Sequence, residues 1–105
     1  MNEAETVFQY IVREISQERG VNPGKMMTSP GIRYDGKVFA FFWNNKMVFK
    51  LGKDRDLSKE FNIAEFSFLN PFKNKPPMKG WYVVEKMYKE KWPDLAKEAL
   101  SVMKK

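Results

Sequence analysis

The sequence predicts an α+β fold: an antiparallel meander sheet of about five strands with N- and C-terminal helices packed on it. Apolar residues recur at helical spacing near both ends of the chain, and apolar and polar residues alternate in its middle as they do in strands. An Asp-Gly pair between two apolar runs also marks a tight hairpin turn. A chain of 105 residues is long enough for one hydrophobic core, so we expect a single domain over residues 1–105.

The first expected element is an amphipathic helix, because apolar residues recur at helical spacing over residues 4–15. Asn2, with Glu5 following at the right distance, is typical of a capping box at the start of a helix. Gly20 offers a left-handed conformation that is expected to end this helix. The Asn-Pro-Gly sequence at 22–24 then predicts a turn.

A run of strands is expected next. Residues 25–28 form a short candidate strand, and the Asp-Gly pair at 35–36 predicts a hairpin turn because both residue types tolerate positive φ. Residues 38–43 are apolar at every position, which predicts a central strand covered on both faces. Two asparagines at 44–45 predict a second turn, and residues 46–51 alternate as a half-exposed strand does.

The second half of the chain is predicted to hold a short helix followed by further strands. Residues 54–61 have acidic residues near their start, where the helix dipole favours them. The two phenylalanines in 66–68 are expected to begin a strand, and prolines keep 70–78 as a loop or edge. The composition of residues 81–85 is typical of a strand.

A final helix is expected to begin near Pro93, whose fixed φ suits the first helical position. Its apolar residues again share one face. Lys104 and Lys105 lie at its end, where positive charge is favourable.

The composition excludes several classes of site. The chain has no cysteine and no histidine, so disulfides, thiolate nucleophiles, imidazole relays and the usual zinc sites are ruled out. No dinucleotide or phosphate-loop fingerprint is present, and the Asp54 and Asp56 pair alone is weak ground for a metal site. We therefore lean away from an enzyme and expect no catalytic residue, cofactor or metal. With no bilayer-length apolar run and no secretion signal, the chain is expected to be cytoplasmic, without a membrane partner.

The charge of the chain is positive and unevenly distributed. Lys and Arg number 19 against 13 Asp and Glu, a net charge of +6, whereas acids outnumber bases near the N-terminus. This pattern permits a polyanion or an acidic protein surface as a partner. Solubility alone also explains a basic surface.

Four residues in the basic second half are the candidate partner-binding residues: Lys75, Lys79, Trp81 and Lys86. Lysines supply mobile positive charge for phosphates, and an exposed indole stacks on a nucleic-acid base. The alternative is that Trp81 lies in the core and that the lysines are simply solvated.

A second basic group lies on the predicted hairpin strands. Arg33, Lys37, Lys46 and Lys50 are candidates for a basic stripe on the solvent face of the sheet. Protection of strand edges and solubility explain these residues equally well.

Three blocks of sequence stand in an order and spacing that is similar to a known family. They are Gly-Lys-Met-Met at 24–27 with the hairpin segment at 31–40, Met-Val-Phe-Lys-Leu at 47–51, and Pro-Met-Lys-Gly-Trp at 77–81. Together they resemble the TfoX/Sxy N-terminal-domain-like family. The YjbR-like family is similar in the Gly-Lys-Val-Phe-Ala strand at 36–40 but fits the last block less well.

The resemblance covers roughly residues 24–103 and implies a TfoX N-terminal-like domain. The namesake regulators of the family act in natural competence, as co-activators alongside the cyclic-AMP receptor protein, and carry a second, C-terminal domain. We expect no such second domain within 105 residues. Because many members of the family are stand-alone domains, the resemblance does not by itself imply a role in competence, and it supplies no catalytic residue.

Two functions are consistent with the sequence. One is a non-catalytic regulatory or interaction module that binds a protein or a nucleic acid. The other is a small-molecule binding or minor enzymatic domain, with an aromatic cleft lined by Trp43, Trp81 and Tyr82. A homodimer formed through an exposed strand edge or an aromatic patch is compatible with both.

Overall fold

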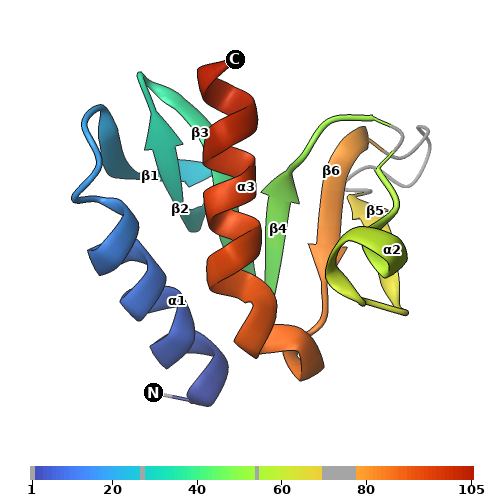
Figure 1. Ribbon diagram of the computed structural model, residues 1–105. Helices are drawn as coiled ribbons and strands as arrows, with labels where there is room; N and C mark the ends of the chain where they lie inside the picture. The colour runs from blue at the N-terminus through green and yellow to red at the C-terminus, as the bar shows by residue number, and fades with distance from the viewer. Residues whose placement is uncertain (1, 27, 54, 70–77) are drawn as a thin grey trace.

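A six-stranded antiparallel sheet carries two long helices on one of its faces (Figure 1). The computed structural model describes residues 2–26, 28–53, 55–69 and 78–105. In chain order, the elements are α1 (Glu3–Ile15), β1 (Val21–Met26), β2 (Ser29–Tyr34), β3 (Lys37–Trp43), β4 (Lys46–Lys50), α2 (Leu57–Phe61), β5 (Phe66–Leu69), β6 (Met78–Val84), a 3₁₀ helix (Lys86–Lys91) and α3 (Trp92–Lys104). The predicted α+β class is therefore confirmed.

The strands lie across the sheet in the order β1-β2-β3-β4-β6-β5, and every neighbouring pair is antiparallel. The first four strands form the predicted meander. The chain then skips the position beside β4, forms β5 at the outer edge, and returns as β6 between β4 and β5. The sheet thus has six strands where about five were predicted.

Two tight turns set the register of the meander. Asp35 and Gly36 have φ of 52° and 85°, and Asn44 and Asn45 have φ of 52° and 61°. Positive φ at both central positions is typical of the two-residue turn whose twist matches that of the strands it joins. Both predicted turns are confirmed.

A β-bulge lets β3 place two consecutive residues in the same core. Ile32 of β2 pairs with Ala40, and Arg33 pairs with Val38, so Phe39 has no partner on β2. The extra residue bends the strand, and Phe39 and Ala40 both belong to the core beneath the helices. Because β3 also lies between β2 and β4, the prediction of a central strand is confirmed.

The main core lies between the sheet and the amphipathic helices α1 and α3. Phe8 of α1 stacks on Phe42 of β3 with ring centroids 5.2 Å apart, and Phe42 meets Trp92 of α3 edge-on at 6.5 Å. Complete burial of a large apolar side chain contributes about 1.5–3 kcal/mol, so these rings hold the two layers together. A smaller cluster on the opposite face of the sheet contains Phe41, Val48, Leu69, Trp81 and Val83.

The first helix is shorter than the sequence predicted. α1 ends at Ile15 with Ser16 as its C-cap, whereas Gly20, with φ of 86°, lies in the turn that leads into β1. The intervening backbone amides make tighter bonds to the carbonyl three residues back, which end the α-helix early. The predicted start is confirmed, because the Asn2 side chain accepts a 2.8 Å hydrogen bond from the backbone N–H of Glu5.

The predicted turn at 22–24 is wrong, because these residues lie within β1. This strand has β2 as its only neighbour among the described strands, so it forms an edge of the sheet. Pro23 lacks an N–H and is tolerated at such an edge, where that position faces solvent instead of a partner strand. Of the strand predicted at 25–28, only residues 25–26 lie in β1, which starts earlier, at Val21, and ends at Met26.

Boundaries in the second half differ from the predicted ones by a few residues. α2 begins at Leu57, later than predicted, and β6 begins at Met78, earlier than predicted. An unpredicted 3₁₀ helix at Lys86–Lys91 leads into α3, where Pro93 lies in the first turn as predicted. Most of the predicted loop, at 70–77, lies outside the described residues. None of the helices in the described ranges has the length and apolar character needed to cross a membrane.

Candidate functional site

Only two of the four candidate partner-binding residues, Trp81 and Lys86, have side chains in the described part of the chain. Lys75 and the side chain of Lys79 lie outside it. Trp81 is only 9% exposed, and its ring lies 5.8 Å from that of Phe41 in the smaller core cluster. Lys86 is exposed at the start of the 3₁₀ helix. It comes five residues after Trp81, a span of roughly 17 Å in an extended chain. An indole buried like that of Trp81 is not available to stack on a base.

The basic residues of the hairpin strands are distributed over different parts of the sheet. Lys46 and Lys50 lie at the two ends of β4, and Arg33 is exposed on β2. Lys46 forms an ion pair with Glu85, Nζ to Oε2 3.3 Å, which neutralises its charge. Lys50 lies at the end of β4, and Lys37 lies at the start of β3. These two strand ends are side by side because the strands are antiparallel. The expected stripe therefore divides: Lys37 and Lys50 line one hollow, while the Lys50 ammonium lies 5.8 Å from the Trp81 ring centroid.

The three aromatic residues expected to line a cleft lie apart. Tyr82 is completely buried in the main core, whereas Trp81, its neighbour in β6, faces the opposite side of the sheet. Trp43 is 45% exposed at the end of β3, with the Lys46 ammonium 6.0 Å from its ring centroid. These three rings enclose no common space.

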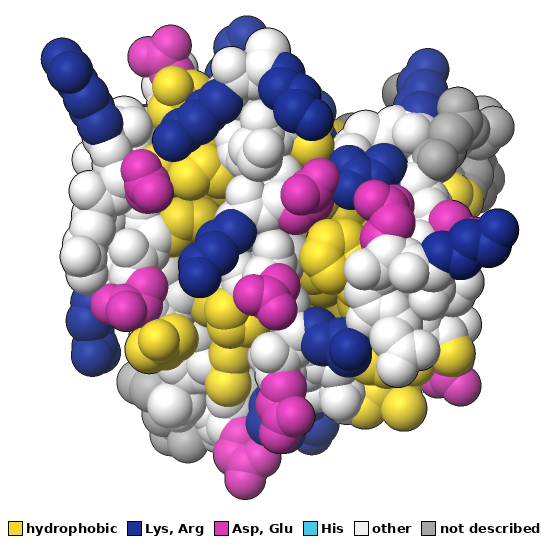
Figure 2. Space-filling view, in the orientation of Figure 1, with side chains coloured by type: hydrophobic (Ala, Val, Ile, Leu, Met, Phe, Trp, Pro, Cys, Tyr) yellow, Lys and Arg dark blue, Asp and Glu magenta, His cyan; other side chains and the backbone are white. Residues whose placement is uncertain are grey.

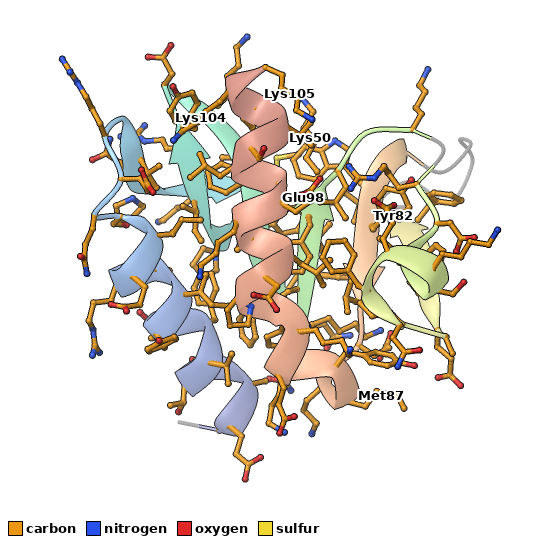
Figure 3. All side chains as sticks on the ribbon, viewed as in Figure 1. Lys50, Tyr82, Met87, Glu98, Lys104 and Lys105 are labelled. Atoms are coloured by element: carbon orange, nitrogen blue, oxygen red, sulfur yellow. The ribbon has the colours of Figure 1, made fainter. Side chains whose placement is uncertain are left out.

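A hydrogen-bonded network around Arg55 was not predicted. The guanidinium donates to Glu60 at 2.7–3.1 Å and to Glu98 at 2.7 Å. It also donates to the carbonyl of Leu51 at 2.9 Å, and the backbone N–H of Arg55 donates to the Tyr82 hydroxyl at 3.1 Å. The network joins the segment before α2 to α3 and to β6, where Glu98 and Tyr82 lie (Figure 3).

The Arg55 network acts as a structural clamp. Hydrogen bonds to Glu60 raise the pKa of the Arg55 guanidinium and lower the pKa of the Glu60 carboxyl. Because one cation faces two carboxylates, the cluster has no excess positive charge to offer a ligand. We therefore assign these residues to the stability of the fold.

Asp56, one of the two carboxylates considered for a metal pair, caps α2. Its Oδ1 accepts hydrogen bonds from the Ser58 hydroxyl at 2.6 Å and from the backbone N–H groups of Ser58 and Lys59 at 3.1 and 3.4 Å. The bond from the Ser58 hydroxyl is the main cause of a lowered pKa at Asp56. Asp54 lies outside the described residues. Elsewhere in the described ranges, no three acidic side chains are grouped closely enough to hold a metal ion.

Five basic residues meet at one end of the molecule, which we call the basic end: Arg19, Lys37, Lys50, Lys104 and Lys105. Antiparallel pairing places the start of β3 beside the end of β4, which brings Lys37 near Lys50. α3 ends at the same place: Val102 and Met103 of its last turn line a hollow with Lys37 and Lys50, and Lys104 and Lys105 follow them in the chain (Figure 3). The Lys50 ammonium itself lies on the opposite face of the sheet, 5.8 Å from the ring centroid of Trp81. Arg19 comes from the segment that joins α1 to β1.

Two shallow hollows lie in the basic end, and both are lined by Tyr34, the last residue of β2, and by the turn residue Asp35. The first has a volume of about 470 Å³ and is lined by Arg19 and Lys104. The second has a volume of about 320 Å³ and is lined by Lys37 and Lys50. Figure 2 shows basic side chains grouped around the end of α3, with apolar surface beside them. The basic end therefore combines positive charge with concave surface.

The positive charge of the basic end is only partly matched by acids within the chain. Lys104 Nζ lies 3.5 Å from the carboxylate of Glu18, and Asp35 lines both hollows. The negative end of the α3 dipole accounts for lysines in the last turn of that helix. It does not account for Lys37 and Lys50, which come from strands.

Sequence reasoning missed most of the basic end, because each residue was explained locally. Lys104 and Lys105 were interpreted as charges that complement a helix dipole, and Arg19 as the residue before a helix stop. The sequence did contain a usable signal. Arg19 precedes the predicted helix stop at Gly20, and Lys104 and Lys105 end the last helix. Lys37 and Lys50 are the first and last residues of the hairpin that holds the turn at 44–45. Only the topology shows that these ends meet.

The chain matches no protein-family model, no curated protein and no solved structure. The resemblance to the TfoX/Sxy N-terminal-domain-like family therefore stays a prediction, and a function has to be argued from the geometry described above.

Proposed function

We propose that this chain is a non-catalytic regulatory or interaction module that binds a nucleic acid through its basic end. The observation that carries the proposal is the convergence of five cations, from separate parts of the chain, around two hollows. Two acids, Glu18 and Asp35, oppose them, so a net positive charge remains for a partner. A basic surface of this kind attracts the phosphate backbone of a nucleic acid.

The basic end suits the phosphates of a nucleic acid better than its bases. Four of its five cations are lysines, whose charge moves on a long stem and contacts phosphate without a fixed direction. Trp81 is buried, so stacking on this residue contributes nothing. We therefore expect strong salt dependence and little sequence preference.

An acidic protein surface is the second candidate partner. The hollow beside Lys37 and Lys50 is also lined by Val102 and Met103, and such apolar contacts suit a protein side chain more than a phosphate. A regulatory role in a bacterial cytoplasm, without a cofactor, is part of the proposal for either partner. The resemblance to the TfoX/Sxy N-terminal-domain-like family supports that role.

Fluorescence polarisation of labelled single- and double-stranded DNA, between roughly 50 and 200 mM salt, tests the proposal. Affinity should fall steeply as salt rises. The double variant Lys37→Gln/Lys50→Gln removes two phosphate contacts, so the slope of log affinity against log salt should become shallower by about 1.5.

The matched control is Lys25→Gln/Lys86→Gln, which removes the same charge from exposed positions outside the two hollows. It should leave the slope nearly unchanged. If the slope fell equally in both variants, the result would contradict a localised site. A larger fall in the control would favour Lys86 as the contact. An absence of DNA binding at low salt would overturn the nucleic-acid proposal, and an acidic peptide that binds the same hollow would identify the protein alternative.

A further inference from the structure

A third hollow, of about 310 Å³, lies between α1 and α3, away from the basic end and on the outer side of the helix layer. Its floor is apolar and consists of Ile11, Ile15, Ala96 and Leu100, which pack the two helices together. Tyr10 stands on the rim with 50% of its surface exposed, which is unusual for an aromatic side chain beside an apolar floor. Apolar surface is visible beside α3 in Figure 2.

The two walls of this hollow carry opposite charges. α1 contributes Glu14, the segment that follows α1 contributes Glu18, and α3 contributes Lys97. Glu18 is engaged with Lys104, but Glu14 accepts a bond only from the Gln17 amide, at 3.2 Å, among the contacts described. Lys97 is exposed and forms no ion pair with any residue in the described ranges. Acid on one wall and base on the other is a pattern that complements itself under a two-fold rotation.

We infer that this hollow is the interface of a homodimer whose two-fold axis runs along the hollow, parallel to the helices. In that arrangement α1 of each protomer faces α3 of its partner. Glu14 then meets the partner's Lys97, and the same contact occurs a second time across the axis. Tyr10 of each protomer packs over the apolar floor of the other, which removes its exposed ring from water.

We favour a second copy of the chain as the occupant because the residues that line the hollow complement each other. They include an acid, a base and an exposed aromatic ring beside an apolar floor, so a second copy supplies every contact. An axis parallel to the helices also places both basic ends on the same side of the dimer. The inference is nevertheless independent of nucleic-acid binding, because Tyr10, Glu14 and Lys97 line neither hollow of the basic end.

Sedimentation velocity over a range of protein concentrations tests the inference. A reversible dimer should form, and Glu14→Lys or Lys97→Glu alone should weaken it at least about tenfold, because like charges then face each other twice. The exchange Glu14→Lys/Lys97→Glu restores opposite charges and should return the dissociation constant to within about threefold of the parent. Lys25→Glu, a charge reversal on β1, is the control and should have no effect.

Three results would overturn the inference: a monomer at every concentration, a dimer that neither single reversal weakens, or a double exchange that fails to recover association. Circular dichroism of each variant shows whether it has folded, so loss of the fold is separable from loss of the interface. DNA binding by variants that stay monomeric would leave the proposed function intact, which keeps the two proposals distinguishable.

Discussion

The Arg55 network and the basic end both concentrate charged side chains, but positive charge is paired with carboxylates in the first and is in excess in the second. Around Arg55, one cation is held by two carboxylates, and every bond is short. At the basic end, two acids oppose five cations, and four of these cations line open hollows. Matched charge that joins three elements stabilises the fold, whereas unmatched charge is available to a partner at little cost to stability.

Removal of the clamp should have the largest effect. Arg55→Ala is expected to lower the free energy of unfolding by about 2 kcal/mol, because the Leu51 carbonyl loses its donor and two carboxylates face each other without a cation. The value stays below that of a fully buried pair because Glu60 and Glu98 remain partly in contact with water. Urea denaturation with an unchanged m-value measures it.

Arg55→Lys is the matched control, since it keeps the charge but loses the planar set of donors. It should recover only part of the lost stability, because an ammonium does not make parallel bonds to Glu60. Full recovery would mean that charge alone, and not the geometry of the guanidinium, holds the clamp.

Acid should weaken the clamp, because the carboxylate of Glu60 must be ionised to bind Arg55. Arg55 lowers the pKa of Glu60 below its ordinary value of 4.5, so this carboxylate contributes stability above that value, and the contribution is lost as the pH falls through the lowered pKa. Denaturation at a series of acidic pH values should show the free energy of unfolding falling in that window. The fall should be smaller in Arg55→Ala, and equal slopes for the two proteins would show that Glu60 is not responsible.

The smallest effect on stability is expected at the basic end. Lys37→Gln/Lys50→Gln should change the free energy of unfolding by less than about 0.5 kcal/mol, because both side chains lie at the surface and have like charges as neighbours. The same urea experiment measures it. A loss as large as that of Arg55→Ala would remove the distinction between the two regions.

Features that depend on neighbouring residues were predictable from the sequence. The turns at Asp35-Gly36 and Asn44-Asn45 need positive φ, which these residue types supply, and the cap at Asn2 depends on an amide three residues away. Local chemistry was sufficient for the turns and the cap. Alternation in β4 correctly predicted one buried face, which holds Met47 and Phe49, but the strand is not half-exposed, because Val48 on its other face is also buried.

Features that depend on distant residues were not predictable. The turn expected at Pro23 was wrong because a proline is tolerated in an edge strand. Only the order of strands in the sheet shows that β1 lies at an edge. Arg55 and Glu98 are 43 positions apart, so no local pattern links them. The basic end was missed for the same reason: its residues are separate in sequence, and antiparallel topology alone brings them together. The bulge at Phe39 was hidden because a wholly apolar run does not show where alternation shifts.

The unlike edges of the sheet limit what self-association can build. β1 carries Pro23, which has no N–H to offer an incoming strand, together with the charged Lys25, whereas β5 contains neither proline nor charge and leaves Phe68 exposed. A sheet that can pair with another molecule at only one edge cannot be extended indefinitely by strand pairing. Pairing of strands between molecules through the β5 edge would therefore join two copies and no more by that edge.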